Sequence, residues 1–166
     1  LSLVASSVGL TAEWISKLAL VGIISLAGIA CYVLLRHLRF GFAISMFASA
    51  MYMSTPIMAD WLAVLGPASI NATLALLPLA YVSYLKAAST TKAWRLMWCA
   101  LSSVFSVGVY PIFGIYLSFV LFFAHALWNI LMSSQRRRSA INYGKVILFI
   151  AVISVITQYW WIRPLF

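Results

Sequence analysis

The stretch SSQRRRSAINYGK, residues 133–145, lies between two strongly apolar segments and carries four positive charges without a negative one. Basic polar segments that interrupt apolar runs are typical of loops in multi-pass membrane proteins. The composition agrees, because 65% of the 166 residues are hydrophobic, 8% are charged and the mean hydropathy is +1.06. So few charged residues do not cover the surface of a soluble domain of this size. The sequence therefore predicts an all-α integral membrane protein.

Six apolar segments follow one another along the chain. An α-helix rises about 1.5 Å per residue, so roughly 20 residues cross a hydrocarbon core of about 30 Å. The sequence predicts a single transmembrane domain over residues 1–166, a six-helix bundle. Its spans are expected at about 15–35, 40–58, 61–85, 94–109, 112–132 and 144–162.

The segment GVYPIFG, residues 108–114, decides between five and six spans. As one helix, residues 94–132 would be about 58 Å long, nearly twice the hydrocarbon thickness. Pro111 removes a backbone donor, and the two flanking glycines tolerate turn geometry. We therefore expect a tight hairpin between two helices, placed near the membrane interface or buried in protein.

The basic residues give an orientation. There are eleven Lys and Arg against two acids, and nine of the eleven fall in the loops 36–39, 86–95 and 133–145, which share one side of a six-span topology. The positive-inside rule places these loops in the cytoplasm or its organellar equivalent and both termini on the non-cytoplasmic side. The expected location is a bacterial inner membrane or an organellar membrane.

At that surface each basic residue gains about 1 kcal/mol against anionic lipid. The residues expected to contact anionic headgroups are Arg36, Arg39, Arg136, Arg137, Arg138 and Lys145. Membrane lipids are thus expected partners. Nucleic acid is not, because the loop has no interleaved aromatic residues for base stacking.

One polar pair lies inside an apolar span. His125 and Asn129 are four residues apart and share a helix face. A polar pair at this depth faces a neighbouring helix or a water-filled cavity. The same two interpretations, a polar pathway or a helix contact, apply to Asn71 and Gln158.

Small residues at i, i+4 predict close helix contacts. Ser45 and Ser49 have this spacing, as do Ser102 and Ser106. The two cysteines, Cys31 and Cys99, both lie in apolar segments, and we expect them to be packing residues.

Titratable groups are scarce. Glu13 and Asp60 are the only acids, and Asp60 suits the N-cap of a following helix. His37 and His125 are the only histidines, and two ligands without a helical spacing motif are a weak sign of metal or haem. No nucleophile-elbow, nucleotide-loop or zinc-binding motif occurs. No catalytic residue, metal or cofactor is predicted, and an enzyme is the less favoured reading.

Three functional interpretations remain open. The preferred one is a non-catalytic multi-pass subunit that serves as a scaffold or anchor, with other membrane subunits or further copies of itself as partners. The second is a small channel or transporter for a neutral or anionic solute. The third is a transmembrane fragment of a larger polytopic membrane enzyme, which the start at Leu1 rather than Met would fit.

Overall fold

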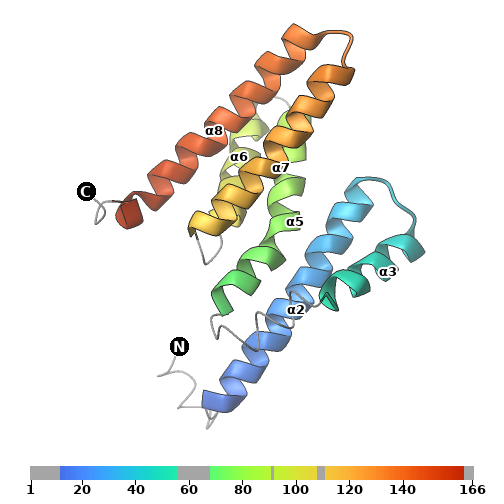
Figure 1. The fold of residues 1–166 in the computed structure, drawn as a ribbon, viewed down its shortest axis with the longest axis vertical. Coiled ribbons are helices and arrows are strands. Elements are labelled where there is room, and N and C mark those ends of the chain that lie inside the picture. Colours follow the sequence, from blue (N-terminus) through green and yellow to red (C-terminus); the bar gives the residue numbers. More distant parts are fainter. Residues whose placement is uncertain (1–11, 56–67, 91, 108–110, 163–166) are drawn as a thin grey trace.

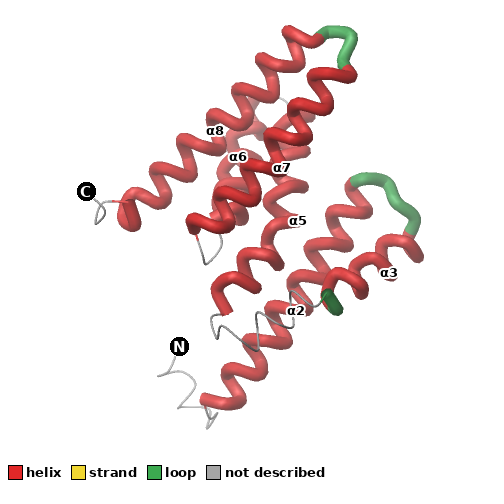
Figure 2. The backbone as a smooth tube through the Cα atoms, in the orientation of Figure 1, coloured by secondary structure: helices red, strands yellow, loops and turns green. Residues whose placement is uncertain are grey.

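The computed structural model describes residues 12–55, 68–90, 92–107 and 111–162. Within these ranges the regular structure is six α-helices and no strand (Figures 1 and 2). The helices are α2 (Ala12–His37), α3 (Phe42–Met53), α5 (Ala68–Ser89), α6 (Lys92–Val107), α7 (Pro111–Met132) and α8 (Arg136–Ile162).

Three helical segments are long and apolar enough to cross a membrane, namely Lys17–His37, Gly114–Met132 and Arg136–Thr157. This supports an integral membrane location. The apolar helix α3 has only 12 residues, so it is about 18 Å long and shorter than the hydrocarbon core. The expected span 40–58 thus exceeds the described helix, and its last residues lie outside the described part of the chain.

Two separate helices occupy residues 92–132, as predicted. α6 ends at Val107 and α7 begins at Pro111, with residues 108–110 outside the described part. Proline is well tolerated as a first helical residue, because its missing N–H would have no partner there.

The basic segment 133–145 is not a loop throughout, in contrast to the sequence interpretation. α8 begins at Arg136 and takes in the arginine run. Arg is a good helix former, and the turn before the helix is closed by Ser133, whose Oγ accepts from the N–H of Gln135 at 3.1 Å. The 27 residues of α8 measure about 40 Å, so the helix exceeds a hydrocarbon core of about 30 Å by roughly two turns.

Helix α5 is the centre of the bundle. It contacts α2 on one side and α6, α7 and α8 on the other (Figure 1). Small residues make these close contacts possible, since Ala75, Ala80, Ser83 and Ala87 are all buried on this helix. The largest fully buried side chain, Tyr84, also belongs to α5.

Pro78, inside α5, explains a hydrogen bond between α5 and α3. As a proline inside a helix it has no N–H for the carbonyl four residues earlier, that of Leu74. The Leu74 oxygen instead accepts a hydrogen bond from the hydroxyl of Tyr52, at 2.8 Å. An unpaired carbonyl costs several kcal/mol in a hydrocarbon environment. Tyr52 therefore satisfies the carbonyl that Pro78 releases, and so fixes α3 against α5.

The serine pairs lie in contacts between helices, as expected. Ser45, Ser49, Ser102 and Ser106 are all buried. Ser102 Oγ donates to the carbonyl of Ala80 on α5 at 3.0 Å. One residue further along α6, the hydroxyl of Ser103 lies 2.8 Å from that of Ser154 on α8. Small hydroxyl side chains thus join α6 to α5 and to α8.

The burial pattern is the reverse of that in a soluble protein. The polar residues in the interior are serines and a threonine, whereas many large apolar side chains face outward. Phe47 is 70% exposed, Trp128 63% and Ile156 68%. Such a surface fits contact with lipid tails or with other apolar helices.

Candidate functional site

The predicted polar pair lies at a junction of α5, α7 and α8. Asn129 Nδ2 is 2.9 Å from Nε2 of His125 and 2.8 Å from the His125 carbonyl oxygen. His125 Nδ1 is 3.4 Å from the hydroxyl of Tyr84 on α5, and that hydroxyl donates to the carbonyl of Phe122 at 3.2 Å. The sequence interpretation included His125 and Asn129 but not Tyr84.

These distances assign the donors. The His125 carbonyl only accepts, so the Asn129 atom beside it is the amide nitrogen, which donates its other hydrogen to Nε2. His125 then carries its proton on Nδ1 and donates it to Tyr84. The Asn129 amide nitrogen, the His125 ring and the Tyr84 hydroxyl thus form a chain of hydrogen bonds that ends on the Phe122 carbonyl.

Aromatic rings surround this histidine. The rings of Tyr81, Tyr84 and Tyr143 each meet the imidazole edge-on, with centroids 5.5–5.8 Å apart. Tyr84 also stacks on Phe122 at 4.5 Å. Such pairs add about 0.5–1.5 kcal/mol each beyond the area that they bury. His125 is thus embedded in a helix contact.

The other two predicted polar residues, Asn71 and Gln158, lie on α5 and α8. Their side chains fall outside the described part of the structure.

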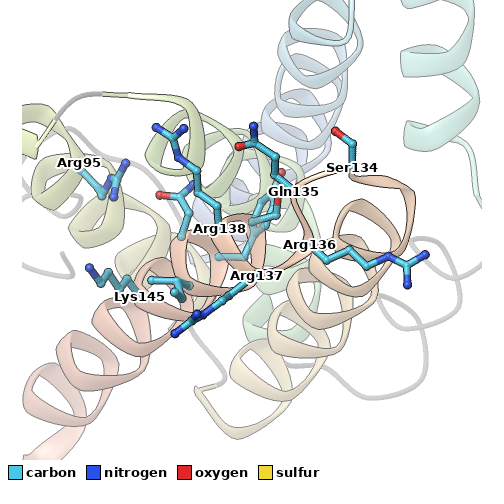
Figure 3. A pocket seen from close by; sticks show the side chains of 11 residues that line it. Arg95, Ser134, Gln135, Arg136, Arg137, Arg138 and Lys145 are labelled. Atoms are coloured by element: carbon cyan, nitrogen blue, oxygen red, sulfur yellow. The ribbon is translucent and has the colours of Figure 1, made fainter.

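A second site is formed by basic residues at one end of the bundle. Four of the six predicted headgroup contacts line a hollow of about 970 Å³ between the first turn of α6 and the first three turns of α8 (Figure 3). They are Arg136, Arg137, Arg138 and Lys145, and they are joined there by Arg95 of α6. Asn142 holds the start of α8 against the end of α5, because its Nδ2 donates to the carbonyl of Ala88 at 3.1 Å.

The remaining two, Arg36 and Arg39, lie apart from the hollow on the connection between α2 and α3. This connection closes α2 as a Schellman motif, in which the Phe40 N–H bonds to Leu35 O at 3.0 Å and the Arg39 N–H to Arg36 O at 3.1 Å. Arg39 has a φ of 67°, in the left-handed region that favours glycine. Arg36 Nη1 donates to the carbonyl of Phe40 at 3.0 Å.

α2 and α7 run in the same direction, so the turns that follow them lie on the same side of their helices. In Figure 1 the turn after α7 is at the top of the view, and the turn after α2 is at the right and lower. At the start of α6, the amine of Lys86 from α5 lies 4.3 Å from the centre of the Trp98 ring. The structure therefore gathers basic residues that are far apart in the sequence.

Two contributors were missed by the sequence interpretation. Arg95 was recognised as a basic residue but was not assigned to a site, because nothing in its spacing relates it to Arg138. Tyr84 could have been found from the sequence, since Tyr81 and Tyr84 are three residues apart, share a helix face and are the two aromatic residues of this helix.

Within the described ranges, no three His, Cys, Asp or Glu side chains are placed to hold a metal ion. Cys31 and Cys99 are free thiols, and Cys99 belongs to the buried core. No protein-family model, curated protein or solved structure matches this chain.

Proposed function

We propose that the protein is a non-catalytic multi-pass membrane subunit that acts as a scaffold or anchor in a larger membrane complex. One observation carries this proposal: His125 and Asn129 form their hydrogen bonds with each other and with Tyr84 of the neighbouring helix α5. Asn129, His125 and Tyr84 form a chain that ends on a backbone carbonyl. A solute pathway needs polar groups that are free to bind a passing solute, whereas these stabilise the bundle.

The outer surface supports the same proposal. α3 exposes Phe42, Ile44, Phe47 and Met51, each more than half accessible. Ile44, Phe47 and Met51 share one face of this helix, which suits contact with lipid and with helices of a partner subunit or of another copy of the chain.

The proposed topology has six spans, both termini on the non-cytoplasmic side and the basic connections in the cytoplasm or its organellar equivalent. Its support is the grouping of basic residues from α6 and α8 around one hollow and the common direction of α2 and α7. The membrane is proposed to be a bacterial inner membrane or an organellar membrane.

Single-cysteine labelling tests this topology. In a variant lacking both native cysteines, we expect Ser89→Cys and Gln135→Cys to react with a membrane-impermeant maleimide from the same side. Trp14→Cys, at the other end of α2, should react from the opposite side. Labelling of Ser89→Cys and Gln135→Cys from different sides would contradict the six-span arrangement.

The subunit role is tested by photo-crosslinking in native membranes. A photoreactive amino acid at Phe47 should give a discrete adduct with another membrane protein or with a second copy of the chain. A second variant carries the photoreactive amino acid at Ser134, in the turn before α8, and is the control for crosslinking that does not depend on the α3 surface.

Flux measurements address the transporter alternative. Liposomes that hold the chain alone should show no solute flux above background. Flux that is lost in His125→Ala and kept in Leu127→Ala, a lipid-exposed position on the same helix, would refute the scaffold proposal in favour of a channel or transporter.

A further inference from the structure

The hollow between α6 and α8 concentrates positive charge. Five cationic side chains from two helices line it, together with the polar side chains of Ser134, Gln135, Ser139 and Asn142. Figure 3 shows the charged ends of Arg95, Arg138 and Lys145 on the side of α8 that faces α6, whereas Arg136 points the opposite way. Three cations thus converge from α6 and α8 on one volume.

These cations have no carboxylate partner in the described part of the chain. The sequence contains only two acids: Glu13 lies in the first turn of α2, at the far end of that helix from its basic turn, and Asp60 lies outside the described residues. Like charges that are held close repel one another, and the arrangement is stabilised when an anion binds between them.

Arg95 is partly fixed in place. Its Nη2 donates to the carbonyl of Thr90 at 3.1 Å, and among the described residues its buried Nε has no hydrogen-bond partner. The Arg95 side chain lines the hollow, so its positive charge is available to an anion there.

We infer that this hollow is a binding site for a phosphate group carrying two or more negative charges, a phosphomonoester or a diphosphate. Arginine donates in a planar fork that matches phosphate oxygens, and lysine adds a mobile point charge. The first turn of α8 also lines the hollow, and the positive dipole end of the helix favours an anion nearby.

The inference rests on the proposed placement of this end at the membrane surface, where a lipid headgroup supplies such a phosphate. Trp94, which is 60% exposed in the first turn of α6, fits a position at headgroup level. A soluble phosphate compound offers the same chemistry, so the experiment distinguishes the two sources.

The test compares two ligands on the purified chain. Phosphatidic acid, a lipid phosphomonoester, is titrated in mixed micelles and followed by native mass spectrometry, with the singly charged diester phosphatidylglycerol as reference. Inorganic pyrophosphate is titrated by calorimetry onto the chain in nanodiscs of neutral phosphatidylcholine. Binding of either ligand supports the site, and the ligand that binds identifies the source.

Three variants distinguish binding at this hollow from a general effect of the net charge of the protein. Arg95→Gln and Lys145→Gln should each weaken binding about tenfold, since a hydrogen bond to a charged group contributes about 1.5–3 kcal/mol and about 1.4 kcal/mol corresponds to a factor of ten. Lys17→Gln removes the same charge at the other end of α2 and should leave the affinity within about twofold. Lys145 is exposed and has no hydrogen bond or ring contact with the described residues, so its variant stays informative if Arg95→Gln fails to fold.

The inference is overturned if neither ligand binds, if Lys17→Gln weakens binding as much as the site variants do, or if phosphatidylglycerol binds as tightly as phosphatidic acid. The pyrophosphate titration needs neither a partner subunit nor an anionic membrane. A failure of the site is therefore distinguishable from a failure of the scaffold proposal.

Discussion

The hydrogen bond between Tyr52 and the Leu74 carbonyl leads to a quantitative prediction. Tyr52→Phe keeps the ring and removes the hydroxyl that satisfies this carbonyl at 2.8 Å. Pro78 provides no N–H to replace it. Losing one partner of a buried hydrogen bond costs about 1–3 kcal/mol, so the free energy of unfolding should fall by that amount.

The reasoning is tested in a second background. In Pro78→Ala the alanine N–H can bond to the Leu74 carbonyl within α5, so Tyr52→Phe should then cost about 1 kcal/mol less than it does beside proline. The measurement is equilibrium unfolding in mixed micelles of dodecyl maltoside and sodium dodecyl sulfate, followed by circular dichroism. It is applied to the original chain, both single variants and the double variant.

Tyr116→Phe is the matched control for this cycle. Tyr116 is 70% exposed on α7, so losing its hydroxyl should change the free energy of unfolding by less than about 0.5 kcal/mol in both backgrounds. Equal costs of Tyr52→Phe beside proline and beside alanine would refute the link between Pro78 and α3.

For three further substitutions the structure predicts whether the free energy of unfolding rises or falls. Gly28→Leu places atoms where the thioether of an α3 methionine now lies, and should destabilise by about 1–3 kcal/mol in the same unfolding assay, whereas Gly22→Leu, with nothing within 4 Å, should not. Arg39→Gly relieves a left-handed residue and should stabilise by about 1 kcal/mol in neutral detergent; a loss of stability would contradict the assigned turn. Ser118→Ala removes a buried hydroxyl without a partner and should be neutral or stabilising, whereas Ser103→Ala should cost about 1 kcal/mol; the reverse order would refute the assigned hydrogen bonds.

The helices and the break between α6 and α7 could be predicted from the sequence. Hydropathy depends on composition along the chain, and Pro111 acts on its own neighbours, so both signals are local. His125 and Asn129 were also predictable as a pair, because a spacing of four fixes a shared helix face. These features require no knowledge of how the helices pack.

The partners of that pair could not be predicted. Tyr84 is 41 residues away from His125, and spacing within a helix does not determine which helix faces meet. The same limit applies to Arg95, which joins Arg138 only because α6 and α8 begin at the same end of the bundle. The start of α8 at Arg136 was missed for another reason. A run of basic residues indicates where the chain leaves the apolar region of the membrane, but it does not indicate where the helix begins.

The long-range contact of Tyr84 has a consequence for biogenesis. Ribosomes add about 5–20 residues per second, so α5 leaves the ribosome about 2–8 s before the histidine that its tyrosine contacts. During that interval α2 and α3 have already been made and can cover one side of α5, while the aromatic side still lacks its neighbours. The insertion machinery therefore has to hold a half-assembled bundle, with α5 as the platform on which the last three helices are placed.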